Sequence, residues 1–184
     1  MRSTGASLGV LATALLVGCG GGAIEGTISG LTADGLVLSD GSETINVAKG
    51  KTKFSFPTEL TDGAVYSVTV VTQPDGLHCT VSDGTGKIDS VSVPSTASVT
   101  CVPVFGISGT VTGLTGDGLV LNDGHDTLSV AAGARTFAFR TLLEVGASYE
   151  VTVDTPPAGQ TCTVTNGSGV ISDRAITEIE LACR

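Results

Sequence analysis

Apolar and polar side chains alternate along much of this chain, a pattern typical of β-strands with one buried face. In residues 66–70 (Tyr-Ser-Val-Thr-Val) and 149–153 (Tyr-Glu-Val-Thr-Val), single polar residues separate the apolar ones. The pattern predicts further short strands at residues 26–29, 36–38, 44–47, 53–56, 78–81, 88–93 and 98–102. After the first 23 residues, no segment has the 3.6-residue period and the caps of an ordinary amphipathic helix.

Asp-Gly pairs separate these segments and mark tight turns, because both residue types tolerate the backbone angles that turns require. They lie at Asp34-Gly35, Asp40-Gly41, Asp62-Gly63, Asp75-Gly76 and Asp83-Gly84. The composition agrees with a β protein, with 26 Gly and only 15% charged residues. Seven or eight short strands in about 80 residues predict an all-β sandwich.

The chain contains an internal repeat. A shift of 83 residues aligns residues 24–86 with residues 107–169, and 35 of the 63 aligned positions are identical. Units of about 80 residues have the size of domains, so the repeat predicts two tandem sandwiches and not a solenoid of short repeats. We define the first copy as residues 24–103 and the second copy as residues 104–184.

The N-terminus has the features of a secretory signal peptide. Arg2 precedes an apolar run at residues 8–17, which is too short for a transmembrane helix of about 20 residues. The following junction, Leu16-Val17-Gly18-Cys19, resembles the lipobox of bacterial lipoproteins. The resemblance implies that residues 1–18 are removed, that Cys19 carries the lipid, palmitate included, and that residues 19–23 form a tether. An ordinary secretory peptide that happens to contain a Cys is the alternative.

The other four cysteines are Cys79, Cys101, Cys162 and Cys183. An odd count of five Cys is unusual for an exported protein, and assigning Cys19 to lipid leaves an even number. Three pairings are possible in principle. Pairing Cys79 with Cys101 and Cys162 with Cys183 is the simplest, because duplicated domains should each bring their own bond. Zinc binding is the alternative use, but close Cys pairs are absent.

Two resemblances extend this interpretation. The Gly-Thr-Val opening at residues 109–111 and the segment 146–153 resemble the prealbumin-like or immunoglobulin-like sandwich modules of bacterial surface proteins. Residues 107–121 and 162–169 are similar to tandem repeats in lipoproteins of β-proteobacterial outer membranes. The second resemblance covers both copies and contains no catalytic motif. In such lipoproteins an Asp directly after the lipidated Cys is associated with retention in the inner membrane, but here that residue is Gly20. The resemblance therefore implies that the protein lies at the outer membrane, exposed on the cell surface.

Candidate chemical groups can be compared between the copies. His78 aligns with Thr161 and His125 with Ser42, so neither histidine recurs, and we interpret both as surface side chains. Carboxylates do recur on the turns, which leaves calcium binding open as an alternative to a simple turn role. They are Asp34, Asp40 and Glu43 in the first copy and Asp117, Asp123 and Asp126 in the second. The sequon at Asn166-Gly167-Ser168 is interpreted as a tight turn.

These features predict a lipid-anchored envelope protein with a structural, display or adhesion role and without catalysis or cofactor. The formal net charge of −9 argues against nucleic acid as a partner. The expected partners are the membrane, through Cys19, and an envelope or host protein or a glycan. A glycan-binding module and a hydrolase remain the alternatives. A glycan site would present aromatic side chains, whereas Phe54, Phe56, Phe137, Phe139 and the two Tyr occupy predicted strand positions where burial in the core explains them.

Overall fold

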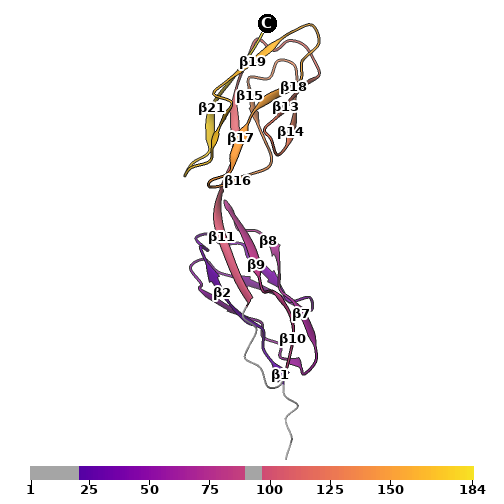
Figure 1. Ribbon diagram of the computed structural model, residues 1–184, viewed down its shortest axis with the longest axis vertical. Helices are drawn as coiled ribbons and strands as arrows, with labels where there is room; N and C mark the ends of the chain where they lie inside the picture. Colours follow the sequence, from indigo (N-terminus) through magenta and orange to yellow (C-terminus); the bar gives the residue numbers. More distant parts are fainter. Residues whose placement is uncertain (1–20, 90–96) are drawn as a thin grey trace, which may run out of the picture.

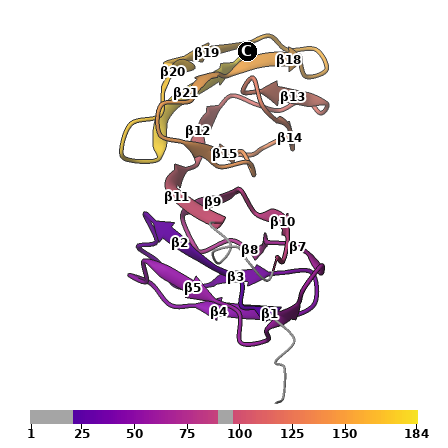
Figure 2. The same ribbon diagram turned by 60° about the horizontal axis from the view of Figure 1, so that its bottom comes forward.

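The computed structural model describes residues 21–89 and 97–184, and these residues form strands joined by turns (Figures 1 and 2). Two lobes follow one another along the longest axis of the molecule, one for each copy of the repeat (Figure 1). Within the described residues, no helix is long and apolar enough to cross a membrane.

The strands of the first lobe are β1 (Gly21–Gly22), β2 (Glu25–Ser29), β3 (Leu36–Ser39), β4 (Thr44–Val47), β5 (Lys53–Ser55), β6 (Leu60–Thr61), β7 (Val65–Ser67), β8 (Thr69–Thr72), β9 (Leu77–Ser82), β10 (Thr85–Lys87) and β11 (Ala97–Phe105). Those of the second are β12 (Ile107–Thr112), β13 (Leu119–Asn122), β14 (Thr127–Val130), β15 (Thr136–Ala138), β16 (Leu143–Glu144), β17 (Ser148–Glu150), β18 (Thr152–Thr155), β19 (Cys162–Thr165), β20 (Ser168–Val170) and β21 (Ile176–Cys183).

Each copy is a two-layered β-sandwich, which confirms the predicted fold class. In the first copy one layer has the order β5, β2, β11, β9 and the other has the order β4, β3, β8. The second copy repeats this arrangement with β15, β12, β21, β19 and with β14, β13, β18. The first long strand of each copy runs parallel to its last, β2 beside β11 and β12 beside β21, while the remaining pairs are antiparallel.

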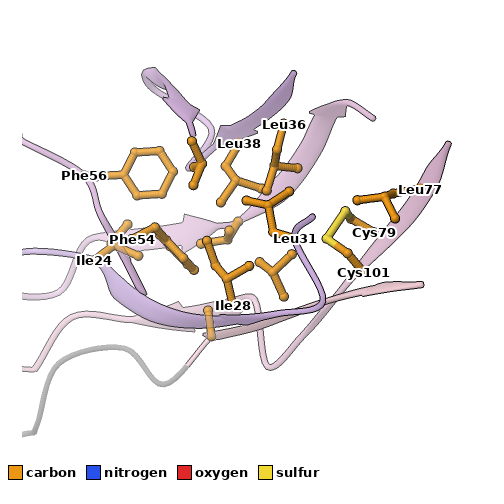
Figure 3. Close-up of a cluster of buried hydrophobic side chains, with 14 of the residues drawn as sticks. Ile24, Ile28, Leu31, Leu36, Leu38, Phe54, Phe56, Leu77, Cys79 and Cys101 are labelled. Atoms are coloured by element: carbon orange, nitrogen blue, oxygen red, sulfur yellow. A yellow bond between two sulfur atoms is a disulfide. The ribbon is translucent and has the colours of Figure 1, made fainter. Parts of the chain in front are cut away.

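Alternating side chains from both layers fill the space between them. In the first copy Ile28 and Phe54 from one layer meet Leu36 and Leu38 from the other (Figure 3). A second, separate cluster of buried side chains occupies the second copy, from Ile107 to Cys183. Burial of this apolar surface is the main favourable term in folding, at roughly 25 cal/mol per Å².

The phenylalanines of each copy form a matched pair in its core. Phe54 and Phe56 lie edge to face with ring centroids 5.9 Å apart, and Phe137 and Phe139 repeat the geometry with the same separation. Edge-to-face packing suits the positive ring edge and negative ring face. The aromatic side chains on which a glycan site would depend are therefore used in the core.

The predicted strand at residues 66–70 is divided into two by the structure. β7 pairs with β10, whereas β8 pairs with β3, and the buried Val68 lies at the change of partner. Its amide donates to the Gly84 carbonyl over 2.7 Å, and a Cβ on Gly84 would lie 2.7 Å from the Val68 carbonyl oxygen. Val151 and Gly167 repeat this contact in the second copy. Periodicity alone does not reveal a change of partner strand.

The predicted strand at residues 88–93 also differs. The strand is β10, three residues earlier. Ile88 follows it and exchanges backbone hydrogen bonds with Gly63 and Ala64, while residues 90–93 lie outside the described ranges. β10 pairs with β7 through Gly86 and Tyr66, whose hydroxyl would lie only 2.4 Å from a Cβ on Gly86. The strand contains Thr, Gly and Lys and has no apolar side chain, so the alternation of apolar and polar residues does not predict it.

Two disulfide bonds join neighbouring strands. Cys79 and Cys101 are direct cross-strand partners on β9 and β11, and Cys162 and Cys183 are partners on β19 and β21. Cys79 exchanges backbone hydrogen bonds with the side chain of Gln73, at 2.7 Å and 3.0 Å, instead of with the opposite strand. Each bond therefore lies within one copy and fixes the last strand to its neighbour.

We expect each copy to lose stability separately when its disulfide is removed. Closing a loop of this length contributes roughly 3 kcal/mol, so the double substitution Cys162→Ala and Cys183→Ala should lower the Tm of the second copy by roughly 12–24 °C. Calorimetry should then show two transitions, the one from the first copy unchanged. Peptide mapping of the non-reduced protein is the control, and a bond between the copies would contradict independent stabilisation.

Candidate functional site at the junction of the two copies

The predicted lipidation residue and the predicted disulfide residues have different positions relative to the described chain. Cys19 lies outside the described residues. The other four cysteines lie in or beside the two cores, and their sulfur atoms are bonded to one another. Bonded in this way, they cannot act as thiolate ligands for zinc. Within residues 21–89 and 97–184, no group of three or more His, Cys, Asp or Glu side chains is placed to hold a metal ion.

The recurring acidic residues act mainly as turn acceptors. Oδ1 of Asp40 accepts hydrogen bonds from the amides of Ser42 and Glu43, at 2.7 Å and 2.8 Å. In the second copy, Oδ1 of Asp123 accepts from the amides of residues 125 and 126, at 2.9 Å and 2.6 Å. The carboxylates of residues 34, 43 and 126 also accept backbone hydrogen bonds, at other points of the loops. This geometry supports the turn interpretation over a calcium site.

Burial of two of these carboxylates is a feature that the sequence analysis missed. The exposed fraction is 3% for Asp40 and 0% for Asp123, and in each the second oxygen, Oδ2, is buried without a hydrogen-bond partner. Burying a carboxylate oxygen without a partner is costly, so the turn that Oδ1 closes must offset that cost. The one sequence signal for this burial is that both Asp residues occupy the same position of the repeat. Asp before Gly is also common at exposed turns, so the signal does not indicate burial.

The two histidines make different contacts. Nε2 of His125 lies 3.0 Å from the carbonyl oxygen of Ser148, within the second copy. His78 lies on β9 of the first copy, and its Nδ1 lies 2.5 Å from Oε1 of Glu144 on β16 of the second. This bond joins the two copies. It explains why His78 does not recur, because the aligned residue, Thr161, lies at the far end of the second copy.

Strand β11 is the main element of the junction (Figure 1). Its first residues pair with β2 and β9 in the first copy, and its last two, Val104 and Phe105, pair with Glu144 and Leu143 of β16. The side chain of Phe105 packs against the core of the second copy. Only Gly106 separates β11 from β12, so a nearly continuous strand passes from one copy into the other.

Backbone hydrogen bonds on both sides brace this strand. The amide of Val145 donates to the carbonyl of Pro103 over 3.4 Å, and the amide of Val104 donates to the carbonyl of Gly76 over 3.0 Å. At the start of the first copy, Gly21 and Gly22 of β1 pair with Thr61 and Leu60 of β6. Adding the repeat length of 83 residues to these positions gives the residues at which β11 pairs with β16. The junction is therefore a modified form of the entry to each copy.

The second copy also carries a polar surface depression, lined by Tyr149, Asn166, Ser168 and residues 174–178. Asn166 has a φ of 58° and its Nδ2 donates to the Glu178 carbonyl over 3.2 Å, while Arg174 lies 3.9 Å from the Glu178 carboxylate. These polar groups largely satisfy one another. The left-handed φ supports the interpretation of Asn166-Gly167 as a tight turn.

Comparison with known proteins yields structural neighbours alone. No protein-family model matches the chain, and no curated protein matches it significantly. It is similar to a streptococcal ancillary pilin (14% identity, 90% of this chain and 63% of that one, TM-score 0.36). It is also similar to the shaft pilin SpaA from Lactobacillus rhamnosus GG (10%, 89% and 98%, TM-score 0.34) and to the major pilin protein T-13 from Streptococcus pyogenes (13%, 89% and 96%, TM-score 0.26).

The chain thus spans less than two thirds of the ancillary pilin. Similarity at this level assigns neither a family nor an activity to this chain.

We expect Asp123→Ala to destabilise the second copy by about 1–3 kcal/mol, because two backbone amides of the turn lose the buried carboxylate that accepts from them. Urea unfolding followed by circular dichroism measures the loss. The matched control is Asp117→Ala, which alters an exposed turn carboxylate of the same copy and should change stability by less than about 0.5 kcal/mol. If both substitutions lowered the free energy of unfolding equally, the buried carboxylate would have no special role in stability.

We expect Phe105→Gly, which restores the residue found at the equivalent Gly22, to loosen the junction without unfolding either copy. NMR relaxation should give similar rotational correlation times for both copies in the native protein and distinct, shorter ones in the variant. Val65→Ala, at a side chain that is 79% exposed, is the control. Unchanged correlation times in Phe105→Gly would show that the side chain does not hold the copies together.

Proposed function

We propose that this chain is a lipid-anchored protein of the bacterial cell envelope that presents two coupled β-sandwiches in a display or adhesion role, without catalysing a reaction. The observation that supports it most is the junction. β11, the packing of Phe105 and the bond between His78 and Glu144 hold the copies in a defined relation. A spacer that carries a binding surface away from a membrane needs such coupling.

The N-terminal end of the first copy fits an anchor at Cys19. The predicted tether at residues 19–23 is shorter than expected, because Gly21 and Gly22 already form a strand pair with β6. Only Gly20 separates the proposed lipid-bearing residue from the fold. Two residues span at most about 7 Å of extended chain. The base of the first copy would therefore stand directly at the membrane surface, and the second copy would point away from it.

Both histidines bond within the scaffold, one across the junction and one to a backbone carbonyl of β17. The core phenylalanines, Phe54, Phe56, Phe137 and Phe139, are at most 6% exposed and offer no flat surface to a sugar ring. These placements favour display or adhesion through a protein surface over the hydrolase and glycan alternatives. The proposed partner class is a protein of the envelope or of a host.

We expect Cys19→Ser to leave an unprocessed precursor and to abolish metabolic labelling with palmitate, because the serine hydroxyl cannot accept the lipid as a thioether. The matched control replaces Cys79 and Cys101 together by Ser, which should leave labelling intact. Undiminished labelling of Cys19→Ser would contradict the anchor.

The proposed role is tested by deleting the gene and complementing it with the native or the Cys19→Ser chain. The native chain should restore adhesion or envelope integrity, and the unanchored chain should not. Hydrolytic turnover by the purified protein, lost on substitution of His78 or His125, would overturn the proposal in favour of an enzyme.

A further inference from the structure

The parallel pairing of first and last strands determines how each copy responds to a pull on its ends. Residues 97–100 of β11 lie beside residues 26–29 of β2, and residues 107–112 of β12 lie beside residues 176–182 of β21. The chain enters the first long strand of a copy, β2 or β12, at its N-terminal end and leaves the last strand, β11 or β21, at its C-terminal end. Tension along the chain therefore slides the two strands past each other, so that their hydrogen bonds share the load in place of breaking one by one.

Both ends of this pairing depend on glycines. A Cβ on Gly26 would lie 2.2 Å from the carbonyl oxygen of Ala97, and one on Gly109 would lie 2.3 Å from that of Ile179. At the other end, a Cβ on Gly30 would lie 2.0 Å from the carbonyl oxygen of Cys101, and Gly113 repeats the approach to Cys183 at 2.1 Å. Only glycine allows the strands to approach so closely.

Hydroxyl groups add contacts across the same two strand pairs. In the first copy Thr27 lies 3.5 Å from Ser98, and Ser29 lies 3.4 Å from Thr100. In the second, Ser108 donates to the Ile176 carbonyl over 3.2 Å and Thr112 to the Leu181 carbonyl over 3.4 Å. These side chains lie on the outer face of the sheet, so they reinforce the strand pair without contributing to the core.

The disulfides limit how far a copy can extend once it yields. Cys79 and Cys101 are 22 residues apart in sequence, and Cys162 and Cys183 are 21 apart. The chain between each pair stays closed under tension. The bonds also fix the last strand to its other neighbour, so that the first strand is the one that must slide.

We infer that the strand pairs β2–β11 and β12–β21 act as mechanical clamps, and that the chain bears tension between its N-terminal end and whatever is attached at its far end. The biological setting of this inference rests on the proposed display or adhesion role. The strand geometry on which it is argued does not depend on that role. The short link at Gly106 passes tension from the first clamp directly into the second.

Single-molecule force measurement tests this inference. The mature chain, without lipid, is held at the Cys19 thiol and at a tag after Arg184, and it is pulled at constant force. We expect two unfolding events, one for each copy. Gly26→Ala should raise the unfolding rate of one event by about tenfold and leave the other unchanged, because the second copy serves as an internal control.

The matched control is Ile45→Ala, which removes a partly buried side chain from β4, a strand outside the clamp. This variant should lower the Tm of the first copy while changing the unfolding rate under force by less than about twofold. Equal acceleration by the two variants would overturn the inference. If Gly26→Ala fails to fold, the pair Thr27→Ala and Ser98→Ala replaces it and should still accelerate one event.

Reduction supplies a second measurement. Opening a disulfide should lengthen each unfolding step by about 70 Å, the extended length of the chain that it closes. Steps of unchanged length would show that the disulfides do not limit how far a copy extends once it yields. Neither result depends on lipid attachment or adhesion, so failure of the clamp and failure of the proposed function can be distinguished.

Discussion

Each copy depends on how closely its first long strand approaches its last. β2 and β11 together carry Ile28, Val99 and Cys101 into the core, and β12 and β21 carry Val111, Ile179 and Leu181. Because side chains alternate between the faces of a strand, a slip of one residue would turn these groups outward. The close contacts at Gly26 and Gly109 fix the register against such a slip. Which side chains of these four strands reach the core follows from that register.

Much of the fold could be predicted from local patterns. Alternation located strands such as Thr44–Val47, and the Asp-Gly pairs marked turns at which Gly35, Gly41 and Gly76 adopt positive φ. These features depend on neighbouring residues, and their signal lies in a short window of sequence. Pairing between distant segments gives no such signal. The division of the strand at Val68 was therefore missed, because it depends on Gly84, sixteen residues away.

The same reasoning applies to the candidate site. Cysteine parity and the repeat suggested the pairs Cys79–Cys101 and Cys162–Cys183 that the structure contains. The bond between His78 and Glu144 could not be inferred, because comparing copies identifies what recurs, and a junction between copies occurs once. Lack of recurrence between copies favours the interpretation of a residue as an ordinary surface side chain. In a tandem protein it also marks the residues that join one unit to the next.

The correspondence between β1 and the end of β11 bears on how such a chain can grow. Gly21-Gly22 and Val104-Phe105 occupy the same place in successive units, one leading in from the N-terminal side and the other joining two folded bodies. A free entry accepts two glycines, whereas an internal joint uses a valine and an aromatic ring. Gene duplication could therefore lengthen the array by one unit with few further substitutions at each new joint. The distance that the array spans can therefore change during evolution by the length of one domain at a time.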